Sequence, residues 1–323
     1  MKYYLVIIIS LFFTNLFSQK DTIIPFREKV LSLHLSKVRS ATKDEDKKKL
    51  NLEFKDYLLE TLLIPESYTY NFPKLKTIGI IDSPDKNFRI VNWNIQLEDE
   101  SNLFFGYVIK KGNKKKNKIV ELVCKSPVYE MPMDVISENN WYGALYYKII
   151  PVKKGKKDCY TLLGWRSNGN ISFMKLIDII EINGNHIKLG TPIFQNKKEK
   201  LKRVVFEYSK KANMTLRYEE KYERIIFDHL SPETPSMNGL YEYYIPDMSY
   251  DAYTFEKDRW VLNEDVIAVN DLEKNTYKQF NVDKKTGEIK EEEVKKSWID
   301  PTDVNAPGSQ HTHTPALPKV KRK

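Results

Sequence analysis

The chain of 323 residues has few of the side chains and spacings on which common enzyme classes depend. It has only five histidines, and it contains neither the Cys-x-x-Cys nor the His-Glu-x-x-His spacing of frequent zinc sites. Its twelve glycines form no Walker loop and no Gly-x-Gly-x-x-Gly loop, and no Gly-x-Ser-x-Gly elbow presents a serine. The chain therefore has few side chains that could bind a transition metal or act as a catalytic histidine, and we expect no cofactor.

Cysteine is also scarce. The chain has two, Cys124 and Cys159, and both lie in apolar runs that are typical of strands. An oxidising compartment would permit a disulfide between them, which would stabilise the fold by roughly 4 kcal/mol. Two buried free thiols are the alternative.

The N-terminus has the pattern of a secretory leader. Lys2 precedes an apolar run that ends near Phe17, and Ser18 is a small residue suited to signal-peptidase cleavage. The run is shorter than the roughly twenty residues that a membrane-spanning helix needs. We therefore predict a signal peptide over 1–18 and an exported protein, periplasmic or extracellular, that does not span the membrane after cleavage. An uncleaved anchor is the alternative.

The formal net charge is +9. For an exported protein this charge favours an anionic glycan, an anionic lipid or an envelope protein as partner, and not a nucleic acid. Solubility conferred by surface lysine is the simpler explanation.

Residues 24–65 predict two packed helices, because an apolar face recurs at steps of three and four, at Leu50, Phe54, Tyr57, Leu58 and Leu62. From Lys74 onward, short turn signals separate runs rich in branched and aromatic residues, and such short connections favour antiparallel pairing. The expected strands are 76–82, 87–97, 102–111, 117–125, 141–152, 158–166, 170–183, 186–190, 202–208, 213–219, 223–228, 251–255 and 259–263.

The predicted fold class is thus mainly β (α+β). An N-terminal helical hairpin within 19–70 precedes a large antiparallel β meander over 71–300, built as a curled sheet, a barrel or a split sandwich. A propeller-like assembly is the alternative. From Pro301 the chain loses most of its apolar residues and gains prolines, which predicts a disordered tail over 301–323.

Several runs carry a resemblance to a known family. They are 88–93, the aromatic run 141–151, and the runs 159–165, 205–209, 226–232 and 246–253. Together with the N-terminal helices they resemble an uncharacterised family of exported proteins common in the Bacteroidota. The resemblance covers most of the chain except the tail. It implies a periplasmic or extracellular location and no particular activity.

Asp228 and His229, at the end of a predicted strand, are the strongest candidates for catalysis. A histidine beside carboxylates suits a general base. Adjacent residues of a strand point to opposite faces, however, so the pattern alone does not bring these two side chains together. A histidine that hydrogen-bonds a turn is the structural alternative.

A possible calcium site follows, because Asp247 and Asp251 place carboxylates on one loop. An Asx turn that opens a strand is the alternative.

The turn at 83–87 weakly resembles the Asp-box of sialidase propellers but lacks its glycine. We expect it to be a hairpin turn in which Asp85 bonds its own backbone.

Aromatic residues are crowded around this loop, and such side chains suit sugars or a partner surface. The candidates are Tyr241, Tyr243, Tyr244, Tyr250 and Trp260. Packing within strands and core is the alternative.

The leading functional hypothesis is a non-catalytic binding or envelope-associated protein that uses the aromatic loop 239–253 and the lysine-rich turns. The alternative is a hydrolase of a glycan or peptide that uses Asp228, His229, Asp247 and Asp251. A pocket in which His229 and carboxylates converge would favour the hydrolase, whereas dispersed residues beside an exposed aromatic patch would favour binding.

Overall fold

The computed structural model describes residues 23–267 except 113–114, 125–130 and 198, together with strands at 276–282 and 289–295. The predicted signal peptide and the predicted tail lie outside these residues. The chain divides into two compact units, 1–267 and 268–323. In the second unit, β17 (Thr276–Val282) and β18 (Ile289–Lys295) pair antiparallel.

The predicted helical hairpin is confirmed. A first helix spans 23–40, α2 (Asp44–Leu63) follows, and η1 (Pro65–Tyr68) continues as a short 3-10 turn. Three acidic residues in the first turn of α2 complement the helix dipole, and Pro65 ends the helix. Each helix buries one apolar side, with the side chains of Leu31, Leu35, Phe54, Leu58 and Leu62 among those that are buried.

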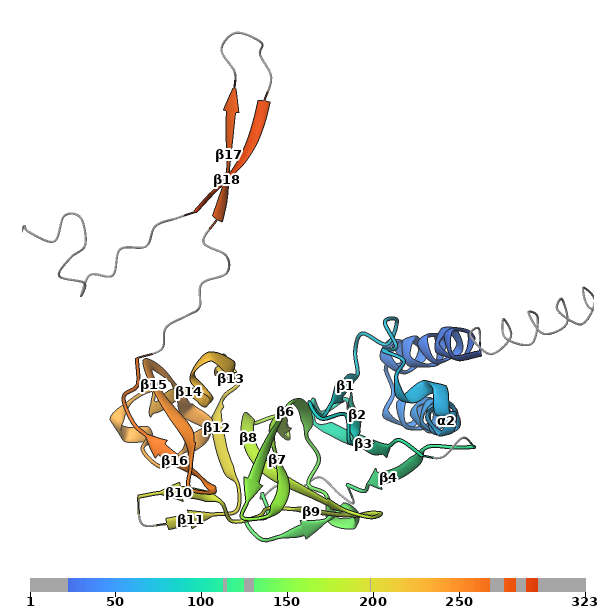
Figure 1. The fold of residues 1–323 in the computed structure, drawn as a ribbon, viewed down its shortest axis with the longest axis horizontal. Coiled ribbons are helices and arrows are strands. Elements are labelled where there is room, and N and C mark those ends of the chain that lie inside the picture. Colours follow the sequence, from blue (N-terminus) through green and yellow to red (C-terminus); the bar gives the residue numbers. More distant parts are fainter. Residues whose placement is uncertain are drawn as a thin grey trace, which may run out of the picture. The chain divides into compact units, whose positions relative to one another are not determined.

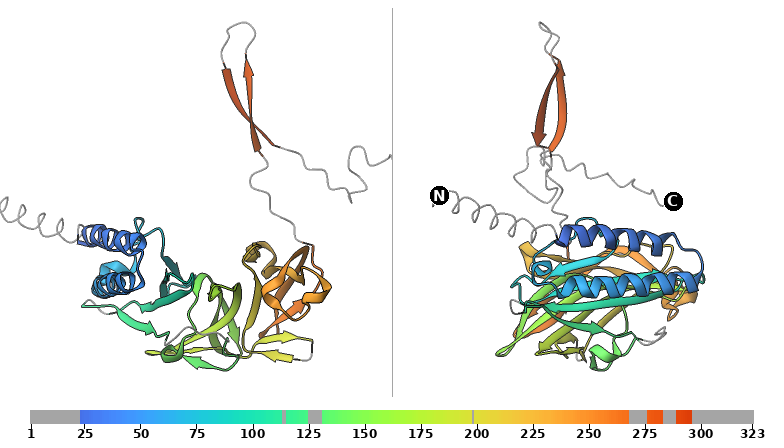
Figure 2. Two further views of the ribbon diagram at one scale, coloured as in Figure 1. Left: turned by 180° about the vertical axis from the view of Figure 1, so that it is seen from behind. Right: turned by 90° about the vertical axis from the view of Figure 1, so that its right-hand side faces the viewer.

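The helices cover one face of a four-stranded antiparallel sheet, here called sheet A (Figures 1 and 2). It contains β1 (Gly79–Asp82), β2 (Arg89–Gln96), β3 (Asn102–Lys110) and β4 (Lys118–Leu122), paired in chain order. Side chains of β2 alternate between the two faces of the sheet. Trp93 packs toward the helices, and Ile90 packs toward the next sheet. The Trp93 indole also donates to Asn51 of α2 at 2.8 Å.

Sheet B lies on the other face of sheet A. It contains β5 (Ile136–Ser137), β6 (Leu145–Lys154), β7 (Lys157–Asn168), β8 (Ser172–Asn183), β9 (His186–Leu189) and β12 (Val204–Ser209), with η2 (Glu138–Asn140) after β5. Both of its faces are buried, since Leu162 and Leu176 pack toward sheet A whereas Leu163 and Ile177 pack toward a third sheet. Double burial explains why these strands read as nearly continuous apolar runs.

Sheet C completes the layers. It contains β10 (Phe194–Asn196), β11 (Glu199–Leu201), β13 (Leu216–Glu219), β14 (Arg224–Pro232), β15 (Tyr244–Glu256) and β16 (Arg259–Asn263). The 3-10 turns η3 (Glu220–Tyr222), η4 (Pro235–Met237) and η5 (Tyr241–Tyr243) lie in its connections. Every pairing in the three sheets is antiparallel except that of β10 with β16.

The fold-class prediction of a mainly β, antiparallel chain behind two helices is confirmed. Within the part of the chain that the structure describes, no sheet closes into a barrel. Five strands were not expected from the sequence: β5, β10, β11, β17 and β18. None of the described helices has the length and apolar character needed to cross a bilayer.

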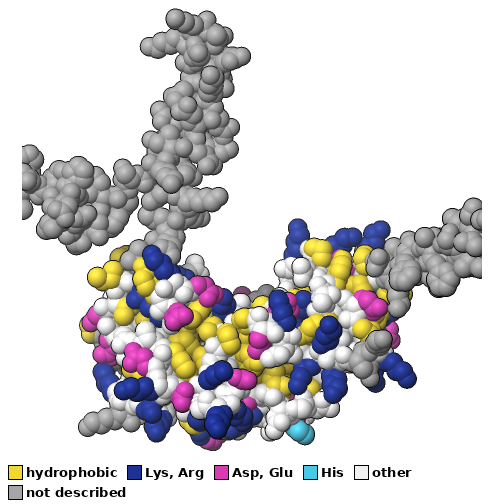
Figure 3. Space-filling view, in the orientation of Figure 1, with side chains coloured by type: hydrophobic (Ala, Val, Ile, Leu, Met, Phe, Trp, Pro, Cys, Tyr) yellow, Lys and Arg dark blue, Asp and Glu magenta, His cyan; other side chains and the backbone are white. Residues whose placement is uncertain are grey.

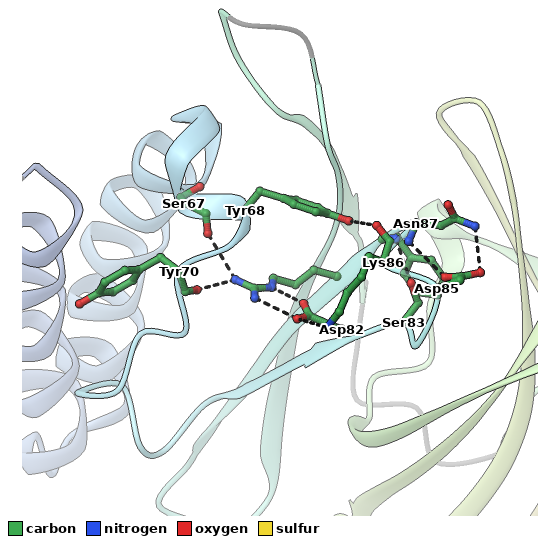
Figure 4. Close-up of polar contacts among 10 residues, drawn as sticks. Ser67, Tyr68, Tyr70, Asp82, Ser83, Asp85, Lys86 and Asn87 are labelled. Atoms are coloured by element: carbon green, nitrogen blue, oxygen red, sulfur yellow. Dashed lines mark hydrogen bonds and ion pairs between the residues drawn. The ribbon is translucent and has the colours of Figure 1, made fainter. Parts of the chain in front are cut away.

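The turn at 83–87 contacts both the segment after α2 and sheet B. The Tyr68 hydroxyl of η1 donates to the Lys86 carbonyl at 2.7 Å (Figure 4). Asp85 accepts from the backbone N–H of Asn87 at 3.1 Å, so the hairpin-turn interpretation is confirmed, and it also accepts from the Tyr160 hydroxyl of sheet B at 2.6 Å. Beside it, the buried Arg89 guanidinium binds Asp82 at 2.5 Å and the Tyr70 carbonyl at 2.6 Å.

Candidate functional site

The candidate site begins with an irregularity between β14 and β15. Asp228 is paired with Tyr250 and Leu230 with Pro246, so His229 lies opposite the extra residues 247–249. Met248 there has a φ of 75°, a left-handed conformation that is uncommon for a non-glycine residue. Proline is tolerated beside such an interruption because the ladder lacks a hydrogen bond there. A bulge of this kind breaks strand alternation and redirects side chains.

A pocket of about 550 Å³ opens over this irregularity. Asp228, His229 and Asp251 all line it. The two side chains have different partners, because His229 bonds to Asp251 and Asp228 to the backbone of Thr215. Most of the other lining side chains are apolar or aromatic and come from β12, β14, β15 and neighbouring segments, including Leu201, Val204, Phe206, Phe227, Leu230, Tyr253 and Leu262.

His229 and Asp251 form a hydrogen-bonded pair within this pocket. Nδ1 of His229 lies 2.8 Å from one carboxylate oxygen of the buried Asp251, and the other oxygen accepts from the backbone N–H of Asp265 at 3.0 Å. The bond to Asp251 raises the pKa of His229. The imidazole is 46 % exposed, so its second nitrogen can meet a solute. The pair can hold or accept a proton at that nitrogen.

The other two polar candidates, Asp228 and Asp247, hydrogen-bond to neighbouring parts of the chain. Asp228 accepts from the backbone N–H of Thr215 at 2.7 Å and ties β14 to the segment before β13. Ser231 donates to Asp247 at 2.8 Å. Among the described residues, no hydroxyl or thiol hydrogen-bonds to His229, so the arrangement presents a proton acceptor without an attached nucleophile.

Asp247 forms the Asx turn that was the alternative to a calcium site. Its Oδ1 accepts from both the backbone N–H and the hydroxyl of Ser249, at 3.0 and 2.7 Å. Burial alone would raise the pKa of Asp247, but the hydrogen bonds from Ser249 and Ser231 lower it. Over the described residues, no group of three or more His, Cys, Asp or Glu side chains is placed to hold a metal ion.

The aromatic candidates separate into three groups. Tyr241 and Tyr244 line the pocket, with ring centroids 5.0 Å apart, and Tyr241 is 56 % exposed. Tyr243 is exposed and Tyr250 half-buried, and neither lines the pocket. Trp260 as a binding residue is wrong, because it is 1 % exposed and donates to the Thr161 hydroxyl at 2.8 Å between sheets B and C.

Most of the residues that line the pocket were missed from the sequence, among them the charged residues Arg203 and Glu207. Arg203 lines the pocket while its guanidinium is fully buried against Asp178 of β8, 2.9 Å away. Glu207, on β12, accepts from the Asn168 amide at 2.9 Å and from the Ser172 hydroxyl. Charged residues inside apolar runs were the available signal, because charges are rarely buried without partners.

Cys124 and Cys159 are not joined to each other, so the structure does not contain the possible disulfide. They belong to different interiors, Cys124 between sheets A and B and Cys159 between sheets B and C. Burial raises the pKa of the Cys159 thiol to about 11, which leaves it largely protonated and unreactive at neutral pH.

Comparison of the chain with protein-family models, with curated proteins and with solved structures finds no match.

Proposed function

We propose that this protein is an exported, non-catalytic binding protein whose pocket over β14 and β15 holds an uncharged sugar unit of a glycan. The observation that carries the proposal is the combination of two adjacent tyrosines, one exposed and one half-buried, with hydroxyl-accepting carboxylates in one pocket. Tyr241 and Tyr244 offer ring faces to the apolar side of a sugar. The carboxylate of Asp228 and the free nitrogen of His229 suit its hydroxyl groups.

The charge of the pocket supports an uncharged ligand. Asp228, Asp251, Glu207 and Glu264 all line it, and the buried Arg203 is already paired with Asp178. An anionic group would be repelled by these carboxylates, whereas hydroxyl groups would donate to them. Anionic partners proposed from the net charge must therefore bind elsewhere on the molecule.

The proposal of export rests on the leader-like residues 1–18 and on the family resemblance. Expression in a bacterial host followed by fractionation tests it. We expect mature protein that begins at Gln19 in the periplasmic or extracellular fraction. Full-length chain retained in the cytosol would contradict export.

Calorimetric titration with neutral oligosaccharides, such as chitotriose and maltotriose, tests the pocket. Tyr241→Ala should weaken the binding of at least one of them about 3- to 10-fold, as expected for the loss of one aromatic contact. Tyr222→Ala removes an exposed tyrosine of η3 that does not line the pocket, and it should leave binding unchanged. Binding to none of the neutral oligosaccharides, or equal loss in both variants, would refute the proposal.

A hydrolase is the second candidate, and the His229–Asp251 bond is the observation that favours it. Such a pair could activate a water molecule on a bound ligand. Chromogenic glycosides and peptide anilides distinguish the two functions. Turnover that is lost in His229→Ala would establish the hydrolase, whereas ligand binding without turnover supports the binding protein.

A further inference from the structure

A second pocket, separate from the first, has four cationic residues among the nine that line it. It has a volume of about 360 Å³. Lys154, Lys200, Lys257 and Arg259 line it, and Asp258 is the only acidic residue among its lining side chains. Ile193 and Phe194, both buried, contribute apolar surface. None of these residues lines the pocket that contains His229.

Elements of two sheets bring the backbones of these cationic residues to one place. Lys257 and Asp258 form the two-residue turn between β15 and β16, and both have positive φ, as a type I′ turn requires. Lys154 ends β6 at the turn into β7, and Lys200 lies on β11. The Asp258 carboxylate accepts from the backbone N–H of Gly155 at 3.0 Å. This bond ties the turn of sheet C to the turn of sheet B.

The four cations have no counter-charge of their own. In the described parts of the chain, none of them forms an ion pair, although other lysines do, such as Lys55 with Glu121 at 2.6 Å and Lys157 with Glu181 at 2.5 Å. On the face drawn in Figure 3, Lys and Arg side chains are interspersed with Asp and Glu. The pocket instead gathers four positive charges against one carboxylate that already has a partner.

We propose that this pocket binds a phosphate-type anion, carried by a soluble phosphate ester or by a lipid headgroup. Lysine is a point-charge ligand for phosphate, and arginine adds two parallel N–H donors. A bound dianion would offset the mutual repulsion of the four cations. The bond between Asp258 and Gly155 holds the two turns together, so the backbones that carry Lys154 and Lys257 are already close before binding. The site is independent of the proposed sugar pocket, since it shares no lining residue with it.

Calorimetry on the full chain at low salt tests the proposal with two probes. The soluble probe is fructose 1,6-bisphosphate, and the lipid probe is phosphatidylcholine vesicles with and without phosphatidylglycerol. The test variant is Lys154→Gln/Lys257→Gln. The control, Lys29→Gln/Lys49→Gln, removes the same charge from exposed helix positions.

We expect each lysine lost from the pocket to weaken binding about fivefold, as for a unit charge pair about 4 Å apart in water. The double variant should therefore bind about 25-fold more weakly, and the control about as well as the wild type. Binding of both probes supports a site for phosphate in general, and binding of anionic vesicles alone assigns it to headgroups. Binding of neither probe, or equal loss in the control, overturns the proposal. Arg259→Gln provides an independent check if the double variant does not fold.

Discussion

Replacing Asp178 by asparagine should destabilise the protein more than any exposed substitution. Asp178 and Arg203 are both fully buried, and the guanidinium Nη2 lies 2.9 Å from the carboxylate. The same carboxylate accepts from the Tyr142 hydroxyl at 2.8 Å and from the backbone N–H of Ile179 at 2.7 Å. Asparagine keeps the shape of the side chain but leaves the Arg203 charge buried without a counter-charge.

Removal of one partner from a buried pair costs about 3–5 kcal/mol. For a protein of this size, about 2–4 °C of melting temperature is lost per kcal/mol, so Asp178→Asn should melt roughly 6–20 °C lower. Urea unfolding followed by tryptophan fluorescence measures the free energy directly, and the m-value should not change.

The exposed pair of Lys148 and Glu220 provides the control, since Glu220→Gln should cost less than about 1 kcal/mol. The double variant Asp178→Leu/Arg203→Met should recover much of the loss, because it removes both charges. A loss below about 1 kcal/mol for Asp178→Asn would refute the reasoning.

Three further predictions concern single side chains. Asp251→Asn should lower the pKa of His229 toward its ordinary value of 6.5, measured by NMR titration of the imidazole. The stabilisation from this pair is present below pH 6.5 in the wild type and is lost as the pH rises through the raised pKa. Gly143→Ala should lower the free energy of unfolding in urea by about 1–3 kcal/mol, because φ at Gly143 is +78° and the new Cβ would lie 2.8 Å from Phe104. Gly155→Ala should lower it less, because the new Cβ would meet no atom. Without reductant, iodoacetamide should modify Cys159 only after unfolding, and mass spectrometry should then count two free thiols; a disulfide would contradict this.

Local chemistry made much of the fold predictable. The turns at Gly155 and Gly184 connect adjacent strands through two residues, and glycine there adopts the positive φ that such turns need. Burial of both faces of sheet B appeared directly as apolar runs in β7 and β8. Each of these signals lies within a few residues of the structure it specifies.

Pairings between distant segments were not predictable in this way. β10 and β11 have three residues each, too few to show alternation, and β10 pairs in parallel with β16 far along the chain. β15 begins at Tyr244, whereas 251 was predicted, because Pro246 and Asp247 are typical turn residues. A bulge accommodates them inside the strand.

In the candidate site, too, the sequence predicted individual residues but not the contacts between distant ones. The sequence identified His229 and Asp251, but their contact joins residues 22 positions apart through a bulge that no local pattern specifies. Trp260 was taken for a surface residue because aromatic content does not distinguish a strand's solvent face from its core face. Its burial depends on sheet B, which the chain forms about a hundred residues earlier.

The path of the chain through the layers has a consequence for how the protein assembles. The helices and sheet A are contiguous in sequence, so their shared interior can close once Leu122 has been synthesised. Sheets B and C are interleaved, because the chain leaves β9 for β10 and β11 and returns as β12 beside β8. These two sheets must therefore be completed together, and the second half of the molecule should gain its protection from hydrogen exchange in a single later step.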